Sequence, residues 1–240
     1  ILKEMIIMAS NNGSEVDNNN YNNKSNGVVK INLFKSPSLI AVFGRCKQGK
    51  SHLIHFILRN ATKNFKFGVV FCSTKFDGAF DYIPNKYVFD TEINATLEKY
   101  TKYLKKLYEK KKTLPPNFII FDDVLGSLKD DASFKNFIST YRHFNCTVFI
   151  SSQYVNLVSP MLRELIVYGF CFGMNTEVSR KNAWLNIGQS LDKKEFLGVL
   201  DDYTQEKYHC LFYNAEAENE SDRFAEYLAP ANLPKNKFKF

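Results

Sequence analysis

The sequence predicts an α/β fold with a mostly parallel central sheet and helices on both faces. Short apolar runs alternate along the chain with segments of helical period, and the runs of strand length are apolar on both faces. Strands of that kind need a covering layer on each side, which is typical of parallel sheets. The 240 residues suffice for one such domain, and 22 Phe and 13 Tyr can fill its core.

The predicted elements alternate between strands and helices. Strands are expected at residues 28–34, 39–43, 67–72, 118–121, 147–150 and 168–172. Helices are expected at residues 49–60, 91–112, 134–144 and 161–167. Apolar residues recur at the helical period in the second helix, which ends before Pro115 because proline disfavours helical geometry in the residue that precedes it. This alternation predicts parallel strands that are joined by helical connections.

The first 26 residues differ from the rest of the chain. Eight of residues 11–26 are Asn, and such a polar stretch cannot bury enough apolar surface to offset its ordering entropy. We expect residues 1–26 to be a disordered arm, in which Met8 resembles a natural start and residues 1–7 are upstream or added sequence. Residues 27–240 are expected to form a single domain with a C-terminal extension of helices and strands.

Composition excludes several classes of protein. The chain is 45% apolar and 24% charged, and it has neither an apolar run of transmembrane length nor a signal peptide at its start, so we expect a soluble intracellular protein. Five widely spaced cysteines form no CxxC pair, which argues against a zinc site or a disulfide framework. Four of the five lie in apolar runs and are expected to be buried. His52 and His55 have no acidic or thiol partners at ligand spacing, so no metal is assigned to them.

Positive charge is concentrated in one segment. The net charge is +7; residues 99–112 hold seven lysines and one glutamate, whereas residues 192–226 hold ten acidic and four basic residues. A concentrated basic face attracts polyanions such as nucleic acid. A lysine-rich helix face is also commonly plain solvated surface, so this feature alone does not decide between the two.

The first motif with chemistry is a phosphate-binding loop. Residues 44–51 read GRCKQGKS, which matches GxxxxGK[ST] and lies between a predicted strand and a predicted helix, as the motif requires. The glycines let backbone N–H groups converge on phosphates, Lys50 reaches the outer phosphate oxygens, and Ser51 offers a hydroxyl to Mg²⁺. With ATP as the nucleotide, the expected contacts are Gly44, Arg45, Cys46, Lys47, Gln48, Gly49, Lys50, Ser51 and His52.

A pair of carboxylates follows another apolar run. Asp122 and Asp123 come directly after residues 118–121. This is the Walker B pattern of nucleotide hydrolases, in which the first acid holds Mg²⁺ through its water shell and the second polarises the attacking water. Alone, the pattern is also compatible with a strand that ends in solvated charges. At 72 residues after Lys50, it favours a hydrolase.

An amide side chain follows a third run. Gln153 comes three residues after the strand predicted at 147–150. Side chains at the carboxyl ends of parallel strands point into the crevice where ligands bind, so Gln153 can hydrogen-bond the γ-phosphate or the nucleophilic water. A glutamine that only caps the loop is the alternative.

The three motifs in this order, GRCKQGKS, FIIFDD and YRHFNCTVFISSQ, resemble those of the genome-packaging ATPases of large DNA viruses and virophages, the poxvirus-type branch of the FtsK/HerA superfamily. The resemblance covers roughly residues 28–215. It implies a RecA-like P-loop NTPase core, a homo-oligomeric ring and ATP-driven translocation of double-stranded DNA into a capsid. It also implies capsid or portal-like shell proteins as partners, and residence in viral factories of the host cytoplasm or in the virion.

The resemblance further implies roles for the residues at the strand ends. Lys50 and Ser51 match the nucleotide and Mg²⁺ contacts, Asp122 matches the metal ligand, and Gln153 matches the polar sensor. Asp123 stands where the superfamily commonly has Glu. Its shorter side chain would act as the base through a repositioned water.

Two arginines are candidates for a contact between subunits. Arg142, eleven residues before Gln153, lies where the superfamily places an arginine that reaches into the neighbouring subunit's site. Arg163, ten residues after Gln153, is a second candidate. A cationic fork there would stabilise charge that develops on the transferred phosphoryl group. Either residue could instead be a surface arginine.

Two other functions fit parts of the pattern. A nucleoside or nucleotide kinase would need an arginine-rich lid, and the chain has few arginines. A nucleotide-dependent assembly switch would bind ATP and capsid or membrane partners but would move no DNA. Stimulation of ATP turnover by double-stranded DNA separates the motor from both. The lysine-rich helix at 99–112 and the loop at 77–84 are the candidate contacts to DNA or to the shell.

Overall fold

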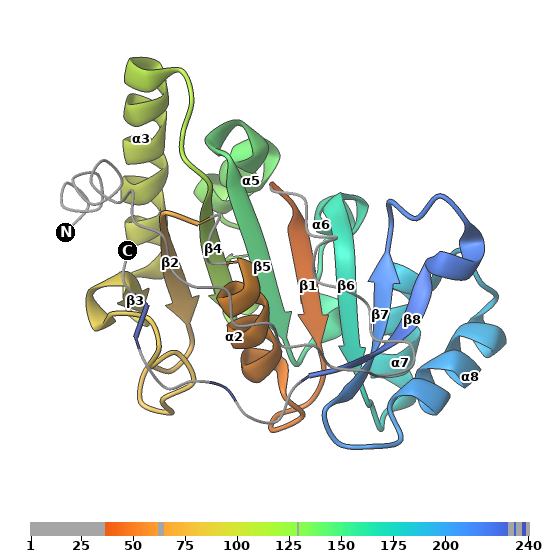
Figure 1. Ribbon diagram of the computed structural model, residues 1–240. Helices are drawn as coiled ribbons and strands as arrows, with labels where there is room; N and C mark the ends of the chain where they lie inside the picture. The colour runs from red at the N-terminus through yellow and green to blue at the C-terminus, as the bar shows by residue number, and fades with distance from the viewer. Residues whose placement is uncertain (1–36, 62–64, 129, 230–232, 234–236, 239–240) are drawn as a thin grey trace.

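A computed structural model of the chain describes residues 37–61, 65–128, 130–229, 233 and 237–238. These residues form an eight-stranded sheet with the strand order β3-β2-β4-β5-β1-β6-β7-β8 (Figure 1). The polar arm and the strand predicted at 28–34 lie outside the described residues. Within the described ranges, no helix is both long and apolar enough to span a membrane.

The sheet is mostly parallel, as predicted. Strands β1 to β6 run parallel to one another, whereas β7 is antiparallel to both β6 and β8. The strands are β1 (Leu39–Phe43), β2 (Phe67–Cys72), β3 (Val88–Phe89), β4 (Asn117–Asp122), β5 (Cys146–Ser152), β6 (Ile166–Phe172), β7 (His209–Asn214) and β8 (Phe224–Leu228). In β1, β2, β5 and β6 every residue is buried, which explains why these runs are apolar on both faces.

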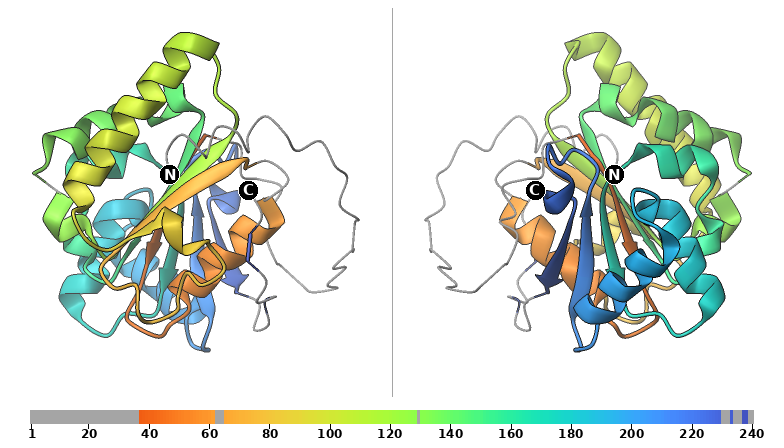
Figure 2. Two further views of the ribbon diagram at one scale, coloured as in Figure 1. Left: turned by 90° about the vertical axis from the view of Figure 1, so that its left-hand side faces the viewer. Right: turned by 90° about the vertical axis from the view of Figure 1, so that its right-hand side faces the viewer.

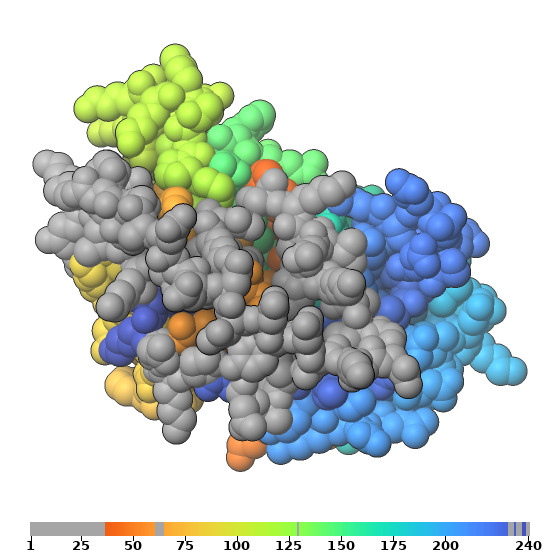
Figure 3. Space-filling model, in the orientation of Figure 1, coloured from red at the N-terminus to blue at the C-terminus, as the bar shows by residue number. Residues whose placement is uncertain are grey.

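Helices cover both faces of the sheet, as predicted, but unequally. Figure 2 shows α2 on one face and α3, α5, α7 and α8 on the other. The helices are α2 (Lys50–Ala61), α3 (Ile93–Lys111), α4 (Leu125–Leu128), α5 (Ala132–Thr140), α6 (Pro160–Leu165), α7 (Glu177–Ala183) and α8 (Lys193–Tyr203), and a π-helical turn, Trp184–Gly188, follows α7. The far end of α3 projects beyond the body of the molecule (Figure 3).

Two predicted helices have different boundaries in the structure. The helix expected at 134–144 begins earlier, because the Asp131 carboxylate accepts a hydrogen bond from Phe134 N at 2.7 Å and caps the first turn. It ends at Thr140, where the chain tightens into a 3₁₀ turn over residues 141–144. The helix expected at 161–167 ends at Leu165, because the next two residues are β-branched and belong to β6.

The core is rich in aromatic side chains, and it encloses most of the cysteines. Phe121 on β4 stacks on Phe71 of β2 with ring centroids 5.5 Å apart, and it meets the edge of Phe134 on α5 at 5.1 Å. Four cysteines are buried and free, as predicted, whereas Cys46 in the phosphate-binding loop is exposed.

The strand register brings the predicted motifs to one edge of the sheet. Phe43 at the end of β1 pairs with Ser152 at the end of β5, and Asp122 at the end of β4 pairs with Ser151. The phosphate-binding loop begins at Gly44, whose N–H donates to the Ser152 carbonyl at 3.3 Å. The carboxyl edge of β1, β4 and β5 is therefore where chemistry can be assembled.

Candidate nucleotide-binding site

The loop between β1 and α2 adopts a backbone that requires its glycines. Gly44 and Gly49 have φ angles of +152° and +115°. A Cβ on Gly44 would lie 2.7 Å from Phe172 Cβ, and a Cβ on Gly49 would lie 2.9 Å from the Tyr208 ring. Both the left-handed backbone and the lack of space exclude larger residues, so the loop depends on glycine at both positions.

Lys50 points back into this loop from the start of α2. Its ammonium donates to the carbonyl oxygens of Gly44 at 2.8 Å and Arg45 at 3.1 Å, which leaves one of its three N–H groups for a phosphate oxygen. Burial lowers the pKa of Lys50, and the nearby Asp123 and Asp122 oppose that shift. Because these carboxylates favour the charged form, the ammonium suits a polyanionic ligand.

Asp122 is a carboxylate with a buried oxygen that lacks a partner. Its Oδ1 accepts no hydrogen bond from any group in the described part of the chain. Burial raises the pKa of Asp122 to about 6, and the nearby Ser151 hydroxyl opposes this shift. An orphaned acceptor of this kind is costly unless a cation or its water shell satisfies it.

Asp123 is held by Gln153 through both carboxylate oxygens. The backbone N–H of Gln153 donates to Oδ1 and its side-chain amide donates to Oδ2, each at 2.8 Å. Asp123 itself has a φ of +53°, and its N–H donates to the Ser151 carbonyl at 2.9 Å. The structure therefore fixes the orientation of the Asp123 carboxylate, and it ties the predicted sensor to the predicted base.

These residues fit Mg²⁺ that arrives with a nucleotide. Ser51 in the first turn of α2 and Asp122 at the end of β4 would be the two protein ligands, and the unpartnered Asp122 oxygen is the observation that favours a cation there. In the described ranges, no group of three or more His, Cys, Asp or Glu side chains could hold a metal alone. Mg²⁺ usually takes few protein ligands and keeps waters and phosphate oxygens.

Arg142 lies at the other edge of the sheet. It belongs to the 3₁₀ turn that precedes β5, so it stands at the amino end of that strand, whereas the phosphate-binding loop follows the carboxyl end of β1. The side chain is exposed; its Nε donates to the Tyr141 hydroxyl at 3.1 Å, and its guanidinium lies 5.6 Å from the Tyr141 ring centre. The fold thus separates Arg142 from its own chain's loop.

Arg163 on α6 is engaged within its own chain. Its Nε donates to Asn186 Oδ1 at 3.0 Å, and the buried Asn186 amide donates in turn to the Val155 carbonyl at 3.0 Å. This network joins α6 to the π-helical turn after α7. Asn186 was not predicted from the sequence, because a lone asparagine in an irregular helix carries no motif.

Two aromatic residues beside the loop were also not predicted. Phe172 at the end of β6 and Tyr208 before β7 contact the positions of Gly44 and Gly49. Phe172 ends a run that could be assigned only as a strand. Tyr208 has a φ of +72°, which is unusual for a bulky residue and cannot be recognised in sequence.

Comparison with known proteins identifies a family. The model of the family described as "Poxvirus A32 protein" matches residues 28–216. Protein 015R of Frog virus 3 is 26% identical over 201 residues, which cover 80% of this chain and 61% of that protein. The chain therefore spans about three fifths of the length of that relative. Protein 075L of Invertebrate iridescent virus 6 is 24% identical over 77% of this chain and 73% of its own length.

Solved structures share the fold. The genome packaging NTPase B204 from Sulfolobus turreted icosahedral virus 2, in complex with ATP-gammaS, superposes with a TM-score of 0.58 at 17% identity, over 80% of this chain and 96% of that one. ATPases 2 and 3 of EssC from Geobacillus thermodenitrificans give a TM-score of 0.53 at 15% identity, over 82% of this chain and 40% of theirs. The predicted P-loop ATPase fold is confirmed.

Proposed function

The chain belongs to the poxvirus A32 protein family, and on that premise we propose that it is an ATPase that drives double-stranded DNA into a viral capsid. The observation that carries the proposal is the convergence of Lys50, Asp122 and Asp123 at one sheet edge, next to a loop whose backbone requires glycine. The structural likeness to a genome packaging NTPase of another virus supports the same role.

Binding would begin at the phosphate-binding loop. The N–H groups of residues 44–51 and the Lys50 ammonium would hold the phosphates at the start of α2, where the helix dipole also favours negative charge. Mg²⁺, when bound with the nucleotide by Ser51 and Asp122, supplies charge neutralisation for the phosphate oxygens. Burial of Lys50 and Asp122 strengthens these interactions, because a low dielectric screens charge less than water does.

Hydrolysis would depend on Asp123. This carboxylate would orient the attacking water and accept its proton, and Gln153 would keep both oxygens in the productive orientation through its two hydrogen bonds. One N–H of the Gln153 side-chain amide is used in this way, so its second N–H and its carbonyl oxygen remain to contact the γ-phosphate or water. A change in either partner of the pair would therefore alter the other.

The guanidinium that stabilises the transferred phosphate would come from a second subunit. A nucleotide hydrolase of this class uses a guanidinium to stabilise charge on the outer phosphate, and the exposed Arg142 stands at the edge opposite its own loop. In a homo-oligomeric ring, Arg142 could face the neighbour's nucleotide. Arg163 is the weaker candidate, because its guanidinium already donates a hydrogen bond to Asn186 of its own chain.

Contacts to DNA and to the shell would use two exposed surfaces. On α3, Leu97, Leu104 and Leu107 are buried, whereas the seven lysines at 99–112 are all exposed and form a basic face. The loop after β2 lies at the carboxyl edge, where Phe76 is 95% exposed. Packaging implies a capsid or portal-like shell partner and residence in the viral factory of the host cytoplasm.

Turnover with and without DNA tests this function. We expect linear double-stranded DNA to raise the rate of ATP hydrolysis by the full chain, and more strongly at low salt, because counterion release favours the complex there. Lys50→Ala should show no turnover in either condition, since the phosphates lose their main protein counterion. ATP binding without any response to DNA would instead favour the assembly switch, and near-normal turnover by Lys50→Ala would remove the P-loop assignment.

A further inference from the structure

The acidic residues lie on one flank of the phosphate-binding loop. In the strand order, β4 and β5 stand on one side of β1, and β6 and β7 stand on the other. Hydrolysis breaks the bond to the outer phosphate, so this phosphate must face Asp122 and Asp123. The nucleoside at the other end of the triphosphate then extends toward the second flank, which is formed by the end of β6 and the start of β7. Phe172 and Cys210 pair across that flank.

An aromatic side chain occupies this second flank. The Tyr208 ring is half-buried and comes within 2.9 Å of where a Gly49 Cβ would lie. Its centroid is 6.1 Å from the ring of His52 in the first turn of α2. The exposed Lys207 places its ammonium 4.9 Å from the Tyr208 ring centre, which shows that a face of this ring is open to a flexible, solvated group. A planar ligand ring could take the place of that ammonium.

The backbone holds Tyr208 in an unfavourable conformation. Its φ of +72° is in the left-handed region, which is unfavourable for a bulky residue and persists only where the surroundings enforce it. The Tyr208 carbonyl accepts a hydrogen bond from Ala229 N at 3.1 Å, which ties the residue to the end of β8. Strain of this kind is concentrated at ligand sites, so the position of the Tyr208 ring is a candidate functional constraint.

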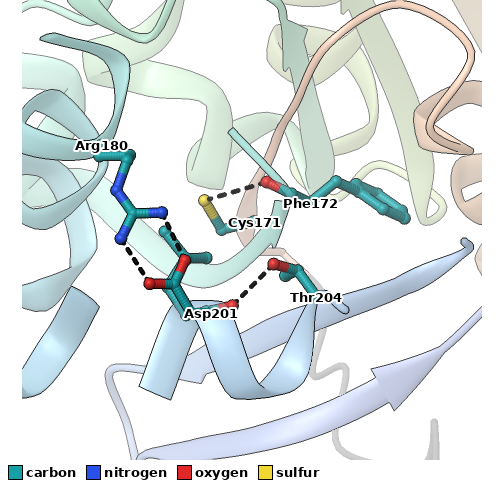
Figure 4. Close-up of polar contacts among 6 residues, drawn as sticks. Cys171, Phe172, Arg180, Asp201 and Thr204 are labelled. Atoms are coloured by element: carbon teal, nitrogen blue, oxygen red, sulfur yellow. Dashed lines mark hydrogen bonds and ion pairs between the residues drawn. The ribbon is translucent and has the colours of Figure 1, made fainter. Parts of the chain in front are cut away.

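The segment before Tyr208 is braced against the end of β6. Figure 4 shows Arg180 of α7 paired with Asp201 of α8; both terminal guanidinium nitrogens donate to the carboxylate, one of them at 2.7 Å. Thr204 ends α8, and its N–H donates to the Asp201 carbonyl at 3.3 Å. The Thr204 carbonyl oxygen would lie 3.5 Å from a Cβ on Gly173, directly after Phe172. These contacts position the segment that leads to Tyr208 beside the end of β6.

We propose that Tyr208 is the stacking platform for the base of the nucleotide. This inference rests on the proposed ATPase function and extends it to the nucleoside end of the ligand. A nucleotide base presents a π-face on which a tyrosine ring can stack, and such stacking stabilises the bound base. Tyr208 would thus hold the base, while the loop and Lys50 bind the phosphates. The His52 ring lies on the same flank, 6.1 Å from the Tyr208 ring.

Matched variants of Tyr208 test the platform. Tyr208→Phe keeps an aromatic ring, whereas Tyr208→Leu keeps apolar bulk against Gly49 but cannot stack. We expect Tyr208→Leu to weaken Mg-ATP binding by about 10-fold, and Tyr208→Phe by less than about 3-fold. Binding of Mg-tripolyphosphate, which has no base, should be the same in both variants and in the unaltered chain. The fluorescence of ethenoadenosine triphosphate should be quenched by the unaltered chain and by Tyr208→Phe, but not by Tyr208→Leu.

The outcomes separate three cases. Equal ATP affinity in the Phe and Leu variants would overturn the proposal, as would an equal loss of ATP and tripolyphosphate, which would show that Tyr208 only supports the loop. Failure of the unaltered chain to bind either ligand would instead contradict the proposed function. If thermal unfolding shows that Tyr208→Leu is not folded, Tyr208→Trp is used in its place. The fluorescence of the added tryptophan should be quenched by ATP and not by tripolyphosphate. Quenching by neither ligand, or by both, would overturn the stacking proposal.

Discussion

The two edges of the sheet carry opposite kinds of chemistry. At the carboxyl edge, Lys50 and Asp122 are largely buried, and Asp123 is fixed by two hydrogen bonds from Gln153. At the amino edge, Arg142 is exposed, and its guanidinium contacts the neighbouring Tyr141. The first edge is preorganised by burial, whereas the second keeps a charged group available to solvent.

On the proposed function, the difference predicts which groups act within one chain and which act between chains. A buried charge costs free energy unless a ligand or partner compensates it, so the carboxyl edge is built for a ligand that brings opposite charge. An exposed guanidinium has little cost and little value until another surface covers it. Loss of a carboxyl-edge residue should therefore act on its own site, and loss of Arg142 should act on a neighbour's site.

The largest expected effect is that of Arg142→Ala, which removes the guanidinium that would act on the carboxyl edge of a neighbouring subunit. These subunits should still bind ATP, because their own loop and carboxylates are intact, but their turnover should fall by on the order of 10³-fold or more. His143→Ala, an exposed side chain on the same turn, is the matched control and should change turnover little. Steady-state ATP hydrolysis with double-stranded DNA present measures both.

Mixing variants decides whether Arg142 acts between subunits. Some interfaces between Arg142→Ala and Lys50→Ala subunits pair an intact loop with an intact arginine. The mixture should regain activity that neither variant has, and dilution that dissociates the ring should remove it. Full activity of Arg142→Ala would move the role to Arg163. An inactive Arg142→Ala that is never complemented would show that the residue acts within its own chain, and the contrast between the edges would fail.

A second prediction concerns the carboxyl edge alone. Asp123→Asn should keep Mg-ATP binding and lose about 10²- to 10⁴-fold in hydrolysis, because an amide cannot accept the proton of the attacking water. Equilibrium binding and single-turnover hydrolysis separate the two steps. Mixing with Lys50→Ala should restore far less activity than it does for Arg142→Ala, since both changes damage a site within one chain. Normal turnover of Asp123→Asn would remove the assignment of Asp123 as the base.

Much of the fold could be predicted because its strands are buried on both faces. The runs that became β1, β2, β4, β5 and β6 are mostly apolar, and β1 and β2 have the predicted boundaries. In β7 and β8 several residues are only half-buried or exposed, so polar residues interrupt the pattern, and these strands were predicted only as an undefined extension. Single-face burial leaves a weaker signal than burial on both faces.

The site could be predicted where a motif encodes it. The loop at 44–51 and the carboxylates Asp122 and Asp123 are local patterns, and parallel strands bring their ends together. The pairing of Gln153 with Asp123 depends on strand register and on the left-handed backbone of Asp123, which no local pattern reports. Tyr208 depends on a backbone conformation held by distant contacts, so only the structure reveals it.

The smallest expected effect tests whether the ionised Asp122 carboxylate destabilises the folded chain when no nucleotide is bound. Burial raises the pKa of Asp122 from 3.8 to about 6 in the folded chain, so the folded state favours the protonated form. Stability is therefore lost as pH rises from about 4 through 6, by up to about 3 kcal/mol at 1.36 kcal/mol per pKa unit.

Asp122→Asn cannot ionise, so without nucleotide it should unfold at a higher temperature than the unaltered chain at pH 7.5, and the difference should shrink toward pH 5. Asp202→Asn, an exposed carboxylate, is the control and should show no such pH-dependent gain. With Mg-ATP the order should reverse at pH 7.5, because only the ionised carboxylate gains from the metal. An equal increase in unfolding temperature at both pH values would mean that the charge of Asp122 does not destabilise the folded chain.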